Sequence, residues 1–586
     1  MLTAEPKAYG SNWHAATRVE GPARARLAVE LDVDLCVVGA GLAGLTVARE
    51  VARHGWSVVV LEAKSVAWSA SGRNTGVVLP GFSVSADALI ERAGLAQAKA
   101  LWARSVAGAE YVRDAARDMP GAALSETGWL HVSKTDDTRA LAHEAALMAG
   151  EFGATVEPWP ADRVREALHS PRYFHGLHYP RGFSLHPLNY ALGLAAAAEA
   201  AGARIFEDTA ALEIDPAGVR KRVVTSHSRV RAAHVVLAGN VHMTELVPQF
   251  AETLLPIFTS VVATTPLGDA LHEAIRFPGA VSDEAGLTGH HHRVVDGRIV
   301  WSGQSSVRLG KPQWQANALV RRIRRTYPAL RDVKAEQAWI GVAGHTVHGM
   351  PQIGEITPGL WLLGGFGGHG LAATAMGGEM LSRAIVENDR AWQMFSPFAL
   401  VWAGGVLGRT AHRVSGWSQH ACEMVEGVLA RTRDARRRRA EASKIAKEAA
   451  AKATAEAAAM AAETAAVAPP PVLLEEPPPV VELAAEPAIE PVVERVVEPV
   501  VETITRPLAE PEVPPAVAAM EPEPTAVAEA IPAASPEVTY GSSGVVEVVS
   551  PPDVPGFKKR KRGKRRKGGP NAPAPDLPPP EDGPAG

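Results

Sequence analysis

One segment near the start of this 586-residue chain constrains its fold more than any other. The apolar run at residues 35–38 leads directly into a G-x-G-x-x-G pattern at residues 39–44, and a helical pattern follows. Gly39 permits a tight turn, Gly41 lets a diphosphate approach the backbone, and Gly44 lets the helix pack close to the strand. The unpaired amides and positive dipole end of that helix favour an anion. The segment predicts a dinucleotide site; a Gly-rich turn of another α/β protein is the alternative.

The residues that follow narrow the choice of dinucleotide. A second apolar strand, residues 56–61, ends at Glu62, where a carboxylate accepts hydrogen bonds from ribose hydroxyls and repels a 2′-phosphate. Residues 68–76 then provide small side chains, backbone donors and the guanidinium of Arg73. That composition suits a loop beneath a flavin ring, with an ordinary surface loop as the alternative. The order of these segments favours FAD over NADP as the bound dinucleotide.

A second Gly-rich segment lies near residue 365. Residues 360–363 predict a strand, several glycines then allow the backbone to lie against a flat ring, and a helix is expected from about Leu371. The positive end of such a helix would face the ring. A Gly-rich turn before a helix is the simpler alternative.

These segments together resemble the D-amino-acid oxidase-like flavoenzymes, which include glycine oxidase, sarcosine oxidase and gamma-glutamylputrescine oxidase. The resemblance covers about residues 13–430, and the stretch from residue 33 to 76 is most similar to the gamma-glutamylputrescine oxidase branch. Thr75 stands where that branch often has glycine. The resemblance implies an FAD-dependent oxidoreductase over about residues 32–390, which oxidises an amine C–N bond to an imine by hydride transfer to flavin N5.

The resemblance also implies an α/β fold, in which a Rossmann-type FAD-binding domain contains an inserted α+β substrate domain. We assign residues 32–81, 180–255 and 337–400 to the FAD-binding domain and residues 82–179 and 256–336 to the substrate domain. Residues 1–31 form an N-terminal extension and 401–468 a helical region. The residues that the motifs and the resemblance assign to FAD are Gly39, Gly41, Leu42, Ala43, Gly44, Glu62, Ala63, Ser71, Gly72, Arg73, Asn74, Thr75, Ala211, Ala238, Gly239, Gly365, Phe366, Gly367, Gly368, His369, Gly370 and Leu371.

Histidines supply the candidate catalytic residues. His369 lies in the predicted flavin loop, His348 precedes a Met-Pro turn, and His291 lies on a predicted hairpin closed by an Asp-Gly turn. Three consecutive histidines, residues 290–292, also suggest a metal. On a strand, however, the outer two share one face and His291 points to the other, so we expect no metal site.

Departures from the family pattern bear on the substrate. The lysine that monomeric sarcosine oxidases place after the flavin-loop His-Gly is missing, and so is the cysteine that tethers their flavin. His348 stands where many members have Asp. We therefore expect non-covalent FAD and a carboxylate-distal amine, such as a gamma-glutamylputrescine-like substrate. A glycine, sarcosine or D-amino-acid oxidase remains the alternative, with oxygen, a quinone or a carrier protein as electron acceptor. A non-catalytic flavoprotein scaffold is a third hypothesis.

The C-terminal part of the chain has a different composition. Residues 469–556 are rich in Pro, Glu, Val and Ala, which predicts a disordered tail (469–586). Its basic cluster at residues 558–567 would suit an anionic partner, and a solubilising end is the simpler interpretation. Two cysteines, Cys36 and Cys422, and the lack of a signal-like or long apolar segment predict a cytoplasmic protein.

Overall fold

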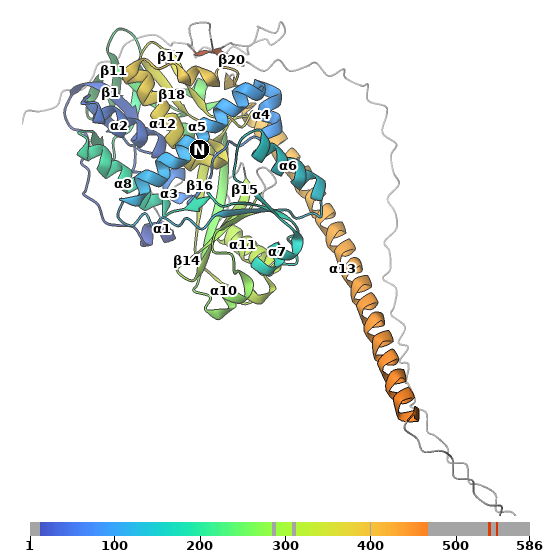
Figure 1. The fold of residues 1–586 in the computed structure, drawn as a ribbon. Coiled ribbons are helices and arrows are strands. Elements are labelled where there is room, and N and C mark those ends of the chain that lie inside the picture. Colours follow the sequence, from blue (N-terminus) through green and yellow to red (C-terminus); the bar gives the residue numbers. More distant parts are fainter. Residues whose placement is uncertain are drawn as a thin grey trace, which may run out of the picture. The chain divides into compact units, whose positions relative to one another are not determined.

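The computed structural model of the chain describes residues 12–283, 289–306, 312–398, 400–466, 537–540 and 546–548. Residues Met1–Arg431 and Ala534–Gly586 form one compact unit, and Thr432–Ala533 form a second. Two eight-stranded sheets organise the first unit, each with its own hydrophobic core (Figure 1). The mixture of parallel strands and helices agrees with the predicted α/β class.

The first sheet has a parallel centre, in the order β18–β11–β1–β2–β8. Strand β1 is apolar along most of its length because both of its faces are buried, as parallel strands require. Strand β17 adds an antiparallel edge, and β9 and β10 form a meander with β11. The strands are β1 (Leu31–Val38), β2 (Val58–Leu61), β8 (Arg204–Phe206), β9 (Ala211–Asp215), β10 (Lys221–Thr225), β11 (Arg229–Leu237), β17 (Gln352–Thr357) and β18 (Leu360–Gly364).

Helices α2 (Leu42–Arg53), α8 (Pro187–Ala200), α12 (Gly370–Glu387) and α5 (Leu95–Arg117) contribute to the core of this sheet. Small residues let them approach: a Cβ on Gly108 of α5 would lie 2.4 Å from the carbonyl oxygen of Ala372. Together with α4 (Ala86–Ala93), α5 packs into the core of the first sheet. The assignment of residues 82–179 to a substrate domain stays a prediction.

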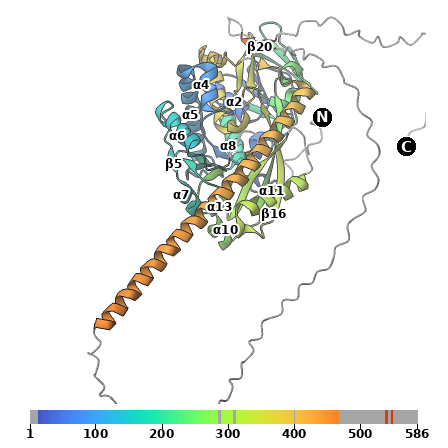
Figure 2. The ribbon, with the colours of Figure 1, turned by 90° about the vertical axis from the view of Figure 1, so that its right-hand side faces the viewer.

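The second sheet runs β16–β12–β15–β14–β13–β4–β6–β5 and is antiparallel except between β13 and β4. It packs against α7 (Ala161–Ala167), α10 (Asp269–Ala274) and α11 (Pro312–Thr326); α10 and α11 lie far from α2 in both views (Figures 1 and 2). Strand β16 lies at one edge of this sheet and spans residue 337, where the sequence analysis placed a domain boundary; that boundary stays a prediction. The strands are β4 (Trp129–Val132), β5 (Glu157–Trp159), β6 (Gly176–Tyr179), β12 (Leu255–Thr264), β13 (Ala280–Ser282), β14 (His291–Val295), β15 (Arg298–Ser306) and β16 (Ala335–His345).

The histidine triplet shows the alternation that the sequence predicted. His292 is buried, stacks on Trp301 at a ring-centroid distance of 4.1 Å, and lies 2.7 Å from the Tyr327 hydroxyl through Nε2. His290 is also buried, and its Nδ1 accepts a hydrogen bond from the Trp301 indole at 3.0 Å. His291 faces the other way, and no group of three metal-ligating residues occurs among the described residues. The outer histidines serve the core.

These buried histidines predict loss of stability in acid. Burial lowers the pKa of both His290 and His292 to about 3, whereas histidines in the unfolded chain titrate near 6.5. The free energy of unfolding is highest at pH values above the pKa of histidine in the unfolded chain. It decreases as the pH falls below that pKa, because only the unfolded state then gains protons. At pH 5.5 each histidine should lower the free energy of unfolding by roughly 1 kcal/mol relative to pH 7.5.

The measurement is the urea midpoint at pH 7.5 and 5.5. We expect His292→Gln to be less sensitive to this pH change than the wild type. The exposed His143→Gln serves as a matched control and should retain the wild-type difference. Equal pH dependence in all three proteins would contradict the assignment.

The C-terminal part is described only in segments. Helix α13 spans Gly405–Ala466, which fits the predicted helical region, and β19 (Leu400–Val401) pairs with β20 (Glu537–Tyr540), which pairs with β21 (Val546–Val548). These two short strands lie inside the predicted tail; the rest of the tail, with its basic cluster, lies outside the described residues. Of the helices that the structure describes, none is both long and apolar enough to cross a membrane.

The remaining elements are short or lie at the rim of the two sheets. They are α1 (Trp13–Ala16), α3 (Ala70–Arg73), β3 (Val77–Val78), α6 (Thr138–Gly150), β7 (Phe183–Ser184), α9 (Pro248–Ala251) and 3-10 turns at Asn240–Met243, Pro328–Leu330, Gly367–His369 and Ala391–Phe395.

Candidate functional site

The predicted dinucleotide residues meet at the carboxyl edge of the parallel strands. Val38 at the end of β1 pairs with Leu61 of β2 and with Leu237 of β11. Each strand is followed directly by one of the predicted residues, which are Gly39, Glu62 and Ala238. Such an edge is where α/β sheets bind ligands. Ala211 opens β9, and a Cβ on Gly239 would lie 2.8 Å from Met243.

The glycines of the first motif are required by geometry. Gly39 has φ +109°, and a Cβ there would lie 2.9 Å from the Ala238 carbonyl oxygen. A Cβ on Gly44 would lie 2.1 Å from the Gly39 carbonyl oxygen, so only glycine lets α2 begin directly over the turn. Gly41 is the N-cap of α2 and has no side chain that could cap the helix. The Leu42 amide donates to Ser71 Oγ at 3.1 Å. The turn therefore leads directly into the N-terminus of α2, which has no side-chain cap and whose positive end favours an anion.

Glu62 shapes the same cradle. Its Oε2 accepts the amide of Ala40 at 2.8 Å, and its Oε1 accepts the amide of Lys64 at 2.9 Å. Burial raises the pKa of Glu62 above its ordinary value. Each carboxylate oxygen has a further lone pair, so the group can still accept a ribose hydroxyl. Ala63, beyond it, points away into solvent.

The second predicted loop forms a short helix, α3, instead of an extended loop. The buried Arg73 donates from Nε to the Trp68 carbonyl at 2.8 Å and from Nη1 to the Ile340 carbonyl at 3.2 Å. Asn74 donates to the Ser71 carbonyl at 3.0 Å and accepts from the Gly76 amide at 2.8 Å. Both side chains therefore hold the loop backbone. Arg73, Asn74 and Thr75 also line the cavity described below, and a Cβ on Gly72 would strike Ala67.

Two residues that the sequence analysis missed hold this loop from outside. Arg293 of β14 is buried and donates from Nε to the Thr75 carbonyl at 2.6 Å and from Nη2 to the Leu185 carbonyl at 2.8 Å. His14 in α1 lies 2.9 Å from the Asn74 carbonyl through Nε2, and burial lowers its pKa well below the usual range. The predicted N-terminal extension is thus, from Asn12 onward, part of the loop's support.

The closing segment leads from β18 into α12 through a 3-10 turn at Gly367–His369. The Gly368 amide donates to Ser83 Oγ at 2.5 Å, and a Cβ on Gly367 would clash with that hydroxyl. No side chain caps α12, whose first turn, with Leu371, is buried. The helix therefore presents its positive end at the loop. Of the predicted residues here, Gly365 and Phe366 are buried. A Cβ on Gly370 would meet nothing within 4 Å.

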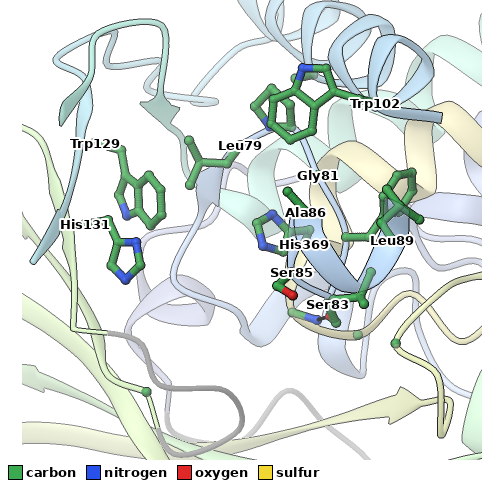
Figure 3. A pocket seen from close by; sticks show the side chains of 18 of the residues that line it. Leu79, Gly81, Ser83, Ser85, Ala86, Leu89, Trp102, Trp129, His131 and His369 are labelled. Carbon is green, nitrogen blue, oxygen red and sulfur yellow. Dashed lines mark hydrogen bonds between the residues drawn. The ribbon is translucent and has the colours of Figure 1, made fainter. Parts of the chain in front are cut away.

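These loops and the second sheet enclose a cavity of about 1340 Å³. His369 lies between Trp102 of α5 and the pair Trp129 and His131 of β4 (Figure 3). His291 and His348 also line the cavity, so all three predicted catalytic histidines meet there. His291 is oriented by Ser282 Oγ, 2.8 Å from its Nδ1, whereas Nδ1 of His348 accepts the Met350 amide at 3.1 Å and so holds a turn.

One face of the second sheet forms a cavity wall with a distinctive composition. Its polar side-chain groups are mainly hydroxyls and imidazoles. No Lys or Arg of the described residues of this sheet lines the cavity. The wall residues are Trp129, His131, Tyr179, Leu255, Ile257, Thr259, Val261, His291, Ser302, Gly341, Val342, Ala343 and His345.

Comparison with known proteins agrees with this arrangement. A family model described as FAD dependent oxidoreductase (DAO) matches residues 34–384. Gamma-glutamylputrescine oxidoreductase of Escherichia coli is 29% identical over 381 residues, 64% of this chain and 88% of that protein. A probable oxidoreductase, OrdL, of Haemophilus influenzae is 28% identical over 394 residues, 65% and 90% of the two chains.

Solved structures show the same fold. Glycine oxidase from Geobacillus kaustophilus superimposes with a TM-score of 0.54 at 19% identity, covering 63% of this chain and 98% of that one. L-Proline dehydrogenase from P. horikoshii gives a TM-score of 0.53 at 17% identity, with the same coverage.

Proposed function

The chain belongs to the family of FAD-dependent oxidoreductases that its residues 34–384 match, and from this we propose that it oxidises a carboxylate-distal amine. It is an enzyme that uses FAD and acts on small amines or amino acids, as its relatives do. By "carboxylate-distal" we mean that any carboxylate lies several bonds away from the C–N bond that is oxidised.

We assign the diphosphate to residues 39–44 and the ribose to Glu62. The ring would lie between α3 and the turn at Gly367–His369. When bound, FAD supplies the chemistry of accepting two electrons from the amine. The positive end of α12 stabilises negative charge at its side of the cavity. The cysteine that we can place, Cys36, is buried in β1 away from the cavity, which supports non-covalent FAD.

The observation that supports this substrate class best is the absence of Lys and Arg from the described part of the sheet wall. A substrate carboxylate next to the reacting carbon would be desolvated against hydroxyls and imidazoles, without a cation from the described part of that wall. An unpaired buried carboxylate costs several kcal/mol. The amine itself must be unprotonated, and we propose that His291 and His369, which line the cavity, accept a proton from it.

The test is anaerobic stopped-flow reduction of the bound flavin. We expect gamma-glutamylputrescine, or another amine without an adjacent carboxylate, to reduce it at least about tenfold faster than glycine, sarcosine or D-alanine, because one unpaired carboxylate is costly. Each amine is compared at equal concentration and at a pH that leaves some neutral amine. Faster reduction by sarcosine or a D-amino acid would overturn the substrate class, and no reduction by any amine would favour a non-catalytic scaffold.

The electron acceptor requires a separate measurement. Reoxidation of the reduced enzyme in air within the turnover time would identify an oxidase, and slow reoxidation would identify a dehydrogenase that uses a quinone or a carrier protein. The cytoplasmic location and an anionic partner for the basic cluster stay predictions.

A further inference from the structure

Helix α5 forms a second wall of the cavity, with one stripe of side chains along it. Trp102, Val106, Ala109 and Arg113 recur at helical spacing and all line the cavity. Trp102 lies at the end of the stripe that is close to His369. A Cβ on Gly81 would lie 3.2 Å from the Trp102 ring and 3.7 Å from the His369 ring. With a rise of 1.5 Å per residue, Arg113 is about 16 Å further along the helix.

The far end of this stripe contains a charged cluster. Arg113 is buried, lies over the Phe183 ring, and donates from Nη2 to the Arg181 carbonyl at 2.6 Å. Glu110 bridges the two arginines, and its Oε1 accepts from Arg181 Nη2 at 2.6 Å. Arg181 also lines the cavity, and its side chain is 66% exposed. Its guanidinium therefore has donors that remain accessible to a ligand.

We infer that Arg181, held by Glu110 and Arg113, binds a carboxylate at the distal end of an elongated amine substrate. The inference rests on the proposed function and deepens it, since it specifies where the substrate's anion belongs. The described part of the sheet wall next to His369 has no Lys or Arg, whereas this end offers a guanidinium, which recognises carboxylates through paired N–H donors. The chain therefore selects for the position of the carboxylate.

The rise of α5 between Trp102 and Arg113 is comparable with the length of such a substrate. In gamma-glutamylputrescine nine bonds separate the amine-bearing carbon from the carboxylate carbon, which is about 10 Å when extended. The side chain of Arg113 leans towards the N-terminus of α5, as helical side chains do, and this shortens the span from the 16 Å of the helix axis. A short α-amino acid could not reach both ends.

The experiment compares two matched amines in anaerobic flavin reduction. N-Glutarylputrescine has the distal carboxylate, and N-butyrylputrescine has the same chain without it. We expect the wild type to prefer the glutaryl compound by about tenfold or more in the second-order rate, the usual size of a charge-assisted hydrogen bond. Arg181→Ala should bring this ratio close to one, and Arg181→Lys should retain part of it. General damage to the enzyme affects both amines alike and leaves the ratio unchanged.

The control is Arg163→Ala, an arginine of α7 that stacks on Trp159 and does not line the cavity, which should keep the wild-type ratio. Equal rates for the two amines in the wild type would overturn the inference while leaving amine oxidation intact. An Arg181→Ala ratio equal to that of the wild type would also overturn it. Failure of every amine to reduce the flavin would instead contradict the proposed function.

Discussion

Gly41→Val is expected to give a folded protein that purifies almost without FAD. A Cβ at Gly41 would already lie 3.0 Å from Ser71 Oγ, and the two methyl groups of valine would occupy the space above the first turn of α2. A diphosphate needs that space to reach the helix amides. We expect a flavin content below roughly a tenth of the wild-type value, because the anion loses its direct backbone donors. Flavin absorbance per protein is the measurement.

The matched control is Gly150→Val. Gly150 is the last residue of α6, and a Cβ there would meet nothing within 4 Å. This variant should keep its flavin. Circular dichroism of Gly41→Val must resemble that of the wild type, since a general loss of fold would also remove the cofactor. Full flavin occupancy in a folded Gly41→Val protein would show that the diphosphate binds elsewhere.

Arg293→Met should destabilise the protein by about 3 kcal/mol or more. The change removes the hydrogen bonds that the guanidinium donates to the carbonyls of Thr75 and Leu185, and both acceptors then stay buried without a donor. Each unsatisfied acceptor costs about 1–3 kcal/mol. Because Thr75 belongs to the loop beside the cavity, we also expect weaker flavin retention. Urea denaturation and flavin release during dilution measure the two effects.

Arg298→Met is the control on the same hairpin. Arg298 pairs with Glu336 at 2.9 Å on the outer part of the second sheet, where removal of an ion pair should cost less than about 1 kcal/mol. Similar losses in both variants would indicate that Arg293 acts only as a general support of the sheet, without a specific effect on the loop.

The parts of the candidate site whose local geometry can be predicted from the sequence are local in the chain. The first glycine motif, the strand before it and Glu62 fall within about thirty residues, so propensity and spacing determine their geometry. The separation of His291 from its two neighbours followed from strand alternation alone. Both predictions needed only the periodicity of one or two elements.

The residues that the sequence did not reveal act over long separations. Arg293 and His14 hold the carbonyls of Thr75 and Asn74, and a backbone carbonyl has no side-chain signature. The placement of α5 depends on how closely Gly108 approaches α12, a contact between segments more than 260 residues apart. Whether a helix that follows an insertion point packs on the first core or on the inserted domain depends on such distant contacts as well.

The two sides of helix α5 have different roles: one packs in the core beside the cofactor loops, and the other lines the cavity. One side, with Leu101, Gly108 and Val112, belongs to the cofactor domain's packing, while Val106 and Ala109 contribute to the wall along which a substrate would extend. Substitutions at Val106 can therefore alter which substrate chain lengths are accepted, while α5 keeps its packing against α12. Enzymes that share this helix can therefore change their amine specificity through very few substitutions, without changes to the residues that bind the flavin.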